Sequence, residues 1–170
     1  LRNKDAGEII SSERMSLERA LFDHGSAAVR SAMLTLLGQE ELTKTEPEQL
    51  KRLTERAWEK ITDSNLDSRY RSQMLEVLKM RDPSGYEVGL KELLNPSEEP
   101  EVQAAAMDVL GRIKGTEISE YILDRWGEWT PEVRESALDA LMREDGRVEQ
   151  LLTALEDGTI SKTALGWNRT

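Results

Sequence analysis

The chain contains a single histidine, the residue type most often used for proton transfer near neutral pH. His24 lies in the sequence Asp23-His24-Gly25. A catalytic triad needs a histidine beside a nucleophile, and a zinc site usually needs several histidines or cysteines. Cysteine is absent, which excludes disulfides, thiol catalysis and cysteine-ligated metal centres. We therefore interpret His24 as a loop residue, and we expect neither a metal nor a cofactor.

Oxygen-bearing side chains could offer metal-binding or acid–base chemistry. Residues 63–67 begin like a calcium loop, but such a loop needs Gly at its sixth position and Glu at its twelfth, where this chain has Ser68 and Met74. We predict instead an inter-helix turn whose Asp and Asn side chains bind free backbone amides. The pairs Glu40-Glu41 and Glu98-Glu99 lie beside predicted helix starts, where carboxylates offset the positive helix end. We interpret both as structural.

Tryptophans are the remaining side chains that could recognise a partner. The chain has four, Trp58, Trp126, Trp129 and Trp167. An exposed tryptophan can anchor an interface, whereas large aromatics at helical spacing usually pack in a core. We predict packing roles for Trp58 and Trp126. Trp129 enters a turn, and it is a candidate for the surface.

Composition limits the classes of protein to which the chain could belong. Of its 170 residues, 38% are hydrophobic and 33% are charged, and the net charge is -10. An acidic chain is a poor ligand for nucleic acid, because phosphate binding needs clustered Lys and Arg. Nothing in the sequence approaches the roughly 18 consecutive apolar residues of a membrane helix. The first residue is Leu1, so we read the chain as part of something longer.

The elements that would position these residues follow an internal repeat. Segments 29–37, 70–78, 102–110 and 133–141 superpose, and their first positions are 41, 32 and 31 residues apart. Counted from each first position, the residues at +4, +5, +7 and +8 are all apolar, which is helical periodicity. A second apolar stretch follows each copy, and these stretches contain Leu50, Leu53, Ala57, Trp58 and Ile61; Val88, Leu90, Leu93 and Leu94; Ile118, Tyr121, Ile122 and Trp126; and Val148, Leu151, Leu152 and Leu155.

Stop and start residues separate the predicted helices. Thr130 precedes Pro131, which is the capping order expected at a helix start, and Thr45 with Glu48 forms a capping-box pattern. Pro83 and Pro100 also suit helix starts. Glycines fall where helix ends favour a left-handed residue, at Gly115, Gly146 and Gly158.

This pattern resembles the short HEAT repeats. The matching features are Pro-Glu-Val at Pro100 and Pro131, Val-Arg at Val29 and Val133, and the apolar spacing after them. Gln103 and Tyr70 depart from the pattern. The resemblance implies an all-α fold, an α-α superhelix (right-handed solenoid) of about four to five antiparallel helix pairs. We predict repeats at about 25–62, 67–95, 99–127 and 130–158, a remnant of an earlier pair in 1–24, and a C-terminal tail or further helix in 159–170.

Residues 148–165 are similar to a more particular family. Leu151-Leu152, Ala154-Leu155-Glu156, Gly158 and Ile160 resemble the last HEAT segment of planctomycete-type putative membrane-bound dehydrogenases, in which a propeller is joined through HEAT repeats to a cytochrome c domain. That resemblance implies a linker in a periplasmic or secreted protein. This chain has no haem motif, so no redox residue is carried over.

In a HEAT arrangement the second helices line the concave side. The candidate interaction surface there comprises Arg52, Arg56, Glu59, Lys91, Glu117, Glu120, Asp124 and Trp129. It becomes acidic toward the C-terminal repeats, where it could receive a basic partner segment, although a solvated face explains it equally.

Three hypotheses follow. The first is a non-catalytic scaffold or spacer that contacts other proteins or neighbouring domains, as a monomer or weak oligomer. The second is a peptide-binding module that uses the acidic side. The third, a HEAT-based lyase-like enzyme or DNA-binding protein, is disfavoured, because the enzyme would need a deep pocket with perturbed ionisable groups and the acidity opposes DNA binding.

Overall fold

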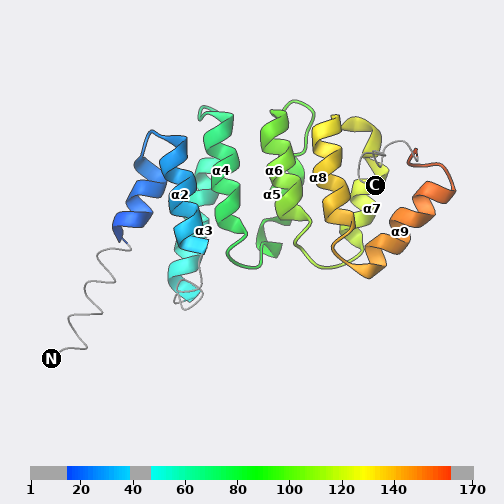
Figure 1. Ribbon diagram of the computed structural model, residues 1–170, viewed down its shortest axis with the longest axis horizontal. Coiled ribbons are helices and arrows are strands. Elements are labelled where there is room, and N and C mark those ends of the chain that lie inside the picture. The colour runs from blue at the N-terminus through cyan, green and yellow to red at the C-terminus, as the bar shows by residue number, and fades with distance from the viewer. Residues whose placement is uncertain (1–14, 39–46, 162–170) are drawn as a thin grey trace. The chain divides into compact units, whose positions relative to one another are not determined.

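The chain is helical throughout residues 15–38 and 47–161, which are the residues that the computed structural model describes (Figure 1). The all-α prediction is confirmed: these residues contain helices and turns and no strand. Residues 15–23 are helical, and the later elements are α2 (Ala27–Gly38), α3 (Pro47–Ile61), α4 (Ser68–Leu78), η2 (Ser84–Tyr86), α5 (Glu87–Glu92), α6 (Pro100–Leu110), α7 (Glu117–Asp124), η3 (Trp126–Glu128), α8 (Pro131–Leu141) and α9 (Asp145–Glu156).

The chain divides into two compact units, Leu1–Met80 and Arg81–Thr170. In the first unit, α4 contacts both α2 and α3. Ile61, Met74 and Leu78 are 0% exposed in its core. Residues 15–23 join the same unit, because Leu21 and Phe22 are buried and Tyr70 Oη donates to the Phe22 carbonyl at 2.8 Å.

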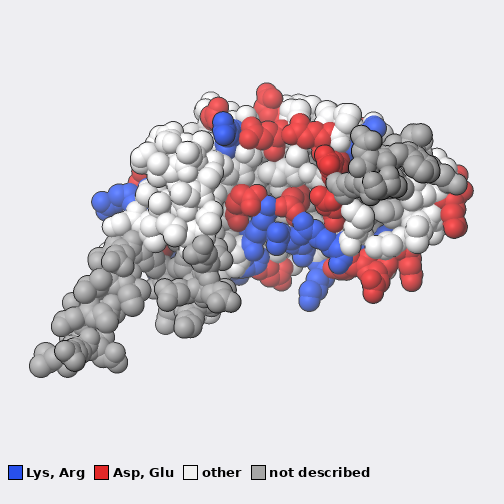
Figure 2. Space-filling view, in the orientation of Figure 1, with Lys and Arg blue, Asp and Glu red and all other residues white. Residues whose placement is uncertain are grey.

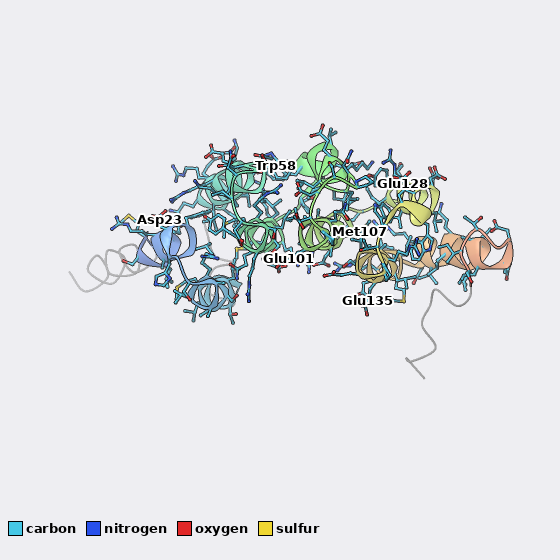
Figure 3. All side chains as sticks on the ribbon, turned by 90° about the horizontal axis from the view of Figure 1, so that it is seen from above. Asp23, Trp58, Glu101, Met107, Glu128 and Glu135 are labelled. Atoms are coloured by element: carbon cyan, nitrogen blue, oxygen red, sulfur yellow. The ribbon has the colours of Figure 1, made fainter. Side chains whose placement is uncertain are left out.

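In the second unit, α6 packs on α8 and α7 packs on α9. Figure 3 views the helices from above and shows α6 and α8 in one row with α5 and α7 in another. Met107 points from α6 into the interior and is 0% exposed, whereas Glu135 points from α8 to solvent. Leu110 and Leu141, each 0% exposed, supply the apolar contacts that each helix needs from its neighbours.

The second residue of each superposed segment makes the same kind of hydrogen bond. Its side chain reaches back to a backbone carbonyl at or just after the end of a preceding helix, where carbonyls have no intrahelical partner. The four donor–acceptor pairs are Arg30 Nη1 to His24 O at 2.7 Å, Arg71 Nε to Ile61 O at 2.7 Å, Gln103 Nε2 to Asn95 O at 2.6 Å, and Arg134 Nε to Trp126 O at 2.9 Å. Gln103 therefore performs the task of the arginines, although it departs from the sequence pattern.

Several boundary predictions are confirmed. Pro131 begins α8, and the Thr130 hydroxyl accepts from the Val133 amide at 3.4 Å. Pro100 begins α6. Gly158 follows the end of α9 and has φ of 82°, which is the left-handed conformation that glycine adopts without strain. Gly115 also has a positive φ, 114°, but it lies five residues after the end of α6 rather than at a helix end. The Thr45 capping hydroxyl and the side chain of Leu37 lie outside the described residues.

Other predictions differ from the structure. Gly146 does not end a helix but lies in the first turn of α9, and it has no positive φ. The second helix of the 67–95 interval is only the six residues of α5. Val88 and Leu152 are 73% and 53% exposed rather than packed. Ile160, in the predicted tail, is 1% exposed and donates its amide to the Ala154 carbonyl at 2.9 Å.

Within the described ranges, no helix combines the length and the apolar character needed to cross a bilayer.

Candidate functional site

A groove of about 780 Å³ lies between α7 and α9 in the second unit. Among the described residues that line it, four are carboxylates and none is Lys or Arg. These residues are Thr116, Glu120, Leu123, Asp124, Gly146, Glu149, Gln150, Thr153, Ala154, Asp157 and Thr159. Leu123 and Ala154 supply apolar surface. The groove therefore combines negative charge with a partly apolar lining.

Helix periodicity explains why these carboxylates share one groove. On α7, Ile118 and Ile122 are buried, and Glu120 and Asp124 occupy another face, four residues apart. On α9, Leu151 and Leu155 are buried. Glu149 lies one helical turn before Thr153 and two turns before Asp157. Residues four apart lie on the same side of a helix, so each helix directs one row into the groove.

A polar contact joins α7 and α9 beneath these rows. Ser119 is 0% exposed, and its single hydroxyl donor lies within hydrogen-bond distance of two acceptors, Gln150 Oε1 and the Thr116 carbonyl, the latter at 2.7 Å. Buried polar groups are costly unless they are paired, so this contact fixes the register of the two helices. It thereby fixes the separation of the two rows of carboxylates.

Arg147 anchors the start of α9, and its charge is directed away from the groove. Its side chain is 0% exposed, and it does not line the groove. The guanidinium donates to the carbonyls of Gly115 at 3.0 Å, Gly111 at 2.9 Å and Ala140 at 3.2 Å, to that of Ile113, and to Glu144 Oε1 at 3.3 Å. Burial lowers the pKa of Arg147 from its usual value, and the Glu144 carboxylate opposes that change.

Within the described part of the chain, the groove carboxylates form no ion pairs. Glu120, Asp124 and Glu149 form no ion pair with any residue of 15–38 or 47–161. Asp157 accepts a hydrogen bond from the Thr159 amide at 2.9 Å. That bond, with a further one from the Thr159 side chain, lowers the pKa of Asp157 below its usual value, so this carboxylate stays ionised into acidic solution.

The remaining charged surface of the same unit is mixed in sign. Figure 2 shows Lys and Arg side chains among Asp and Glu beside α6 and α8. Arg143, for example, forms an ion pair with Asp108 there. The groove differs because its lining carries one sign only.

The residues of the predicted interaction surface are distributed over both units. Glu120 and Asp124 line the groove, and Glu117 is exposed in the first turn of α7. Lys91 lies in a neighbouring cleft between α5 and α7. Arg52, Arg56 and Glu59 belong to α3 in the other unit. Arg56 there pairs with Asp23 at 3.1 Å, and its Cζ lies 4.2 Å from the centre of the Phe22 ring.

Trp129 is not an exposed anchor. It is 3% exposed, and its ring centre lies 6.3 Å from that of Tyr121. Its indole Nε1 donates to the Leu94 carbonyl at 3.4 Å. A buried indole N–H usually needs such a partner, and this bond accounts for the inward orientation. The predicted surface therefore loses Trp129.

Sequence reasoning missed the α9 side of the groove. Glu149, Thr153 and Asp157 are separated by four residues each, and that spacing was the available signal. The apolar residues of the same stretch suggest a buried helix face, and they obscure this spacing of polar residues. Leu152, counted among those apolar residues, is exposed.

The other candidate chemical residues have local structural roles. His24 Nδ1 accepts from the Ser26 amide at 3.0 Å. Asp63 Oδ1 accepts from the Asn65 amide at 3.0 Å, and Asp67 caps α4 by accepting from the Tyr70 amide at 3.2 Å, as the predicted turn requires. Trp126 is buried and Trp58 half-buried. Glu40, Glu41 and Trp167 lie outside the described residues.

Comparison of the chain with protein-family models, with curated proteins and with solved structures finds no match.

Proposed function

We propose that this chain is a HEAT-like helical-repeat module that works by binding, and that its groove between α7 and α9 receives a basic, extended segment of a partner protein. The repeat part of the proposal is supported by the sequence period and by the recurring hydrogen bond from Arg30, Arg71, Gln103 and Arg134 to helix-end carbonyls. Helices that each bury one face against a neighbour are the arrangement on which solenoids are built.

One observation carries the binding proposal. Four carboxylates line a single groove, and Glu120, Asp124 and Glu149 form no ion pair in the described part of the chain. Like charges that face one another without a counter-charge repel, and a cationic ligand relieves that repulsion. Leu123 and Ala154 would contact the aliphatic stems of lysine or arginine side chains, which commonly cover apolar surface.

The size of the groove fits a short peptide rather than a folded domain. Its volume of about 780 Å³ falls in the range of roughly 300–1,000 Å³ that is usual for ligand sites. An extended chain advances about 3.3 Å per residue. A segment of five to seven residues with alternating lysines therefore places several cations along the two rows of carboxylates.

The direct test is titration of the whole chain with a fluorescent lysine-alternating peptide at several salt concentrations. The Debye length falls from about 10 Å at 0.1 M salt to about 3 Å at 1 M, so we expect the affinity to fall steeply with salt. Replacing Glu120 and Glu149 by glutamine should weaken binding about five- to tenfold, because each exposed ion pair is worth at most about 1 kcal/mol.

The matched control replaces Glu101 and Glu135 by glutamine. Both residues are exposed on the row of α6 and α8 (Figure 3), and neither lines the groove. The control changes the net charge by the same amount, so it should leave the affinity nearly unchanged. Binding that ignores salt, or equal weakening by the two double variants, would contradict the proposal.

A further inference from the structure

A second cleft lies on the other side of α7. It has a volume of about 350 Å³, and it is lined by Val88, Lys91, Glu92, Asn95, Tyr121 and Arg125. Tyr121 Oη donates to the Lys91 carbonyl at 3.3 Å, which ties α7 to α5 at this point. Val88, at the start of α5, is 73% exposed. The cleft thus offers an aromatic wall, an uncovered aliphatic side chain, two cations and one carboxylate, that of Glu92.

The Tyr121 ring contacts both cations of the cleft. Lys91 Nζ lies 5.0 Å and Arg125 Cζ lies 5.2 Å from the centre of its ring. Both distances are within the roughly 6 Å over which a cation is attracted to an aromatic ring. Lys91 and Arg125 therefore contact the same ring, and both also line the same cleft, so a carboxylate seated in that cleft would have two cations along its walls.

The carboxylates that now accompany these cations are easily exchanged. Lys91 pairs with Glu87 at 2.6 Å, four residues earlier, and Arg125 pairs with Glu128 at 3.5 Å, three residues later. All four side chains are between 28% and 48% exposed. Ion pairs of this kind on a helix surface contribute only a few tenths of a kcal/mol, so an incoming carboxylate can replace either partner at little cost.

The surface charge consequently reverses across one helix. Glu120 and Asp124 face the groove toward α9, whereas Tyr121 and Arg125 face the cleft toward α5. The residues within each pair are four positions apart, and the pair Tyr121 and Arg125 begins one position after the pair Glu120 and Asp124. One residue of an α-helix corresponds to about 100° of rotation, so α7 presents an anionic face and a cationic-aromatic face at the same level.

We propose that the partner segment is charge-segregated: its basic stretch occupies the groove between α7 and α9, and a carboxylate side chain of the same segment lies between Lys91 and Arg125 in the cleft between α5 and α7. This inference rests on the proposed function and specifies the partner further. Neighbouring helices are about 8–10 Å apart, and an extended chain advances about 3.3 Å per residue. About three residues therefore separate the acidic residue from the basic stretch, and an aliphatic residue beside the acid would contact Val88.

The test compares three synthetic peptides in titrations of the whole chain. The first contains an acidic residue next to a valine, three glycine-serine spacer residues and a lysine-alternating stretch. The second has the same composition with its acidic residue placed inside the lysine stretch, and the third contains the lysine stretch alone. We expect the first to bind about five- to tenfold more tightly than the second, since two cations of the cleft then contribute.

Variants assign that gain to the cleft. Replacing Lys91 and Arg125 by glutamine should abolish the preference for the first peptide and leave the affinity for the lysine stretch unchanged or slightly higher. Arg112 and Lys114 are exposed cations that line neither site. Replacing both by glutamine is the matched control, because it makes the same change in net charge, and it should keep the preference. Circular dichroism and the lysine-stretch affinity together report that the variants remain folded.

The outcomes separate this inference from the function on which it rests. Salt-sensitive binding of the lysine stretch without any preference for the first peptide overturns the charge-segregated partner and leaves the basic groove intact. A preference that survives in the Lys91 and Arg125 variant overturns it too. No binding of any peptide overturns both proposals. The chain could also form a concentration-dependent dimer that the Lys91 and Arg125 variant cannot form. If that dimer is found and the first peptide is not preferred, the cleft binds a second copy of the chain and the inference is overturned.

Discussion

Arg147 is the point at which the ends of several elements of the second unit meet. Its guanidinium donates to the carbonyls of Gly111, Ile113 and Gly115, which follow α6, and to that of Ala140 in α8. Carbonyls at helix ends lack intrahelical partners, and here they are covered by protein. The charged side chain therefore replaces water for four backbone groups at once.

Removing this side chain should be costly. We expect Arg147→Met to lower the free energy of unfolding by about 2–4 kcal/mol, because each buried acceptor left without a donor costs about 1–3 kcal/mol and the groups can partly relax. Arg147→Lys, which keeps a charge and fewer donors, should lose less. Urea denaturation followed by circular dichroism measures both changes.

The control for this change is Arg143→Met, which makes the same substitution four residues earlier. Arg143 is partly exposed and pairs with Asp108, and a pair of that kind contributes at most about 1 kcal/mol. Equal losses for the two variants would show that the carbonyl cluster does not depend on Arg147.

At this scale the sequence predicts residue types better than it predicts burial. Arg143 and Arg147 are the same residue type and lie four positions apart, and nothing in the neighbouring sequence indicates that only Arg147 is buried. Trp129 is the reverse case: its position near a turn suggested exposure, but the Leu94 carbonyl, 35 residues earlier in the chain, receives its indole N–H. Both outcomes depend on groups that are distant in sequence.

α6 and α8 approach each other closely at Gly111. A Cβ added at Gly111, the residue after α6, would lie 2.5 Å from the Ala140 Cβ and 2.9 Å from its Cα. The approach therefore depends on a hydrogen atom at Gly111 and on the small side chain of Ala140. The same approach brings the Gly111 carbonyl within reach of Arg147.

Gly111→Ala should therefore separate these helices. The added methyl group meets backbone as well as side chain, and overpacking of this kind typically costs about 1–3 kcal/mol. Gly111 has helical φ, so the substitution introduces no backbone strain of its own. Thermal and urea unfolding of the variant measure the loss.

Gly85→Ala provides the comparison within the same unit. Nothing lies within 4 Å of a Cβ at Gly85, and its φ is not positive. Alanine there should be neutral or stabilising by up to about 1 kcal/mol, since it restricts the unfolded chain. A larger loss at Gly85 than at Gly111 would refute the packing argument.

Element boundaries were predictable where a residue has a local effect. Pro100, Pro131 and Thr130 mark helix starts because proline and a capping hydroxyl act on adjacent backbone. The faces of short helices were less predictable. Val88 lies two residues before the buried Leu90 and hence about 200° away around the helix. The sequence pattern places both residues on one apolar face, whereas in the structure Val88 lies on a different face from Leu90.

For the whole molecule, the repeat spacing predicted helices correctly, and the acidic character of its later part indicated where a groove carboxylate would be found. Glu120 and Asp124 are among the outward residues predicted for a second helix, and both line the groove. The opposite wall was not predicted, because a groove needs the relative placement of α7 and α9, which Ser119 and Gln150 determine through a contact 31 residues apart. Periodicity in one helix carries no information about that distance.

The net charge of -10 includes three aspartates whose ionised form is stabilised by folding. Asp63, Asp82 and Asp157 accept hydrogen bonds from the amides of Asn65, Ser84 and Thr159, two residues later, at 3.0, 3.0 and 2.9 Å. Hydrogen bonds from those residues lower the pKa of each carboxyl below 3.8. They occur in both units, so their effect belongs to the chain as a whole.

A lowered pKa in the folded state means that, around and below the ordinary value, the unfolded chain binds more protons. The stabilisation is therefore complete above about pH 4 and is lost as the pH falls through the folded pKa values. Replacing the three aspartates by asparagine keeps an acceptor oxygen and removes the charge. We expect the difference in unfolding free energy between wild type and this triple variant to change mainly as the pH falls below about 4, as measured by urea denaturation at each pH.

General repulsion among carboxylates must be subtracted, because three fewer negative charges also relax an acidic chain. A second triple variant, with Glu92, Glu132 and Glu156 replaced by glutamine, makes the same change in net charge at exposed positions. The difference in stability between this variant and the wild type should reflect only the repulsion among carboxylates, which weakens as carboxylates become protonated. The aspartate variant should instead approach this control as the solution is acidified below about pH 4. Parallel profiles for the two variants down to about pH 2 would mean that the turn hydrogen bonds do not favour the charged form.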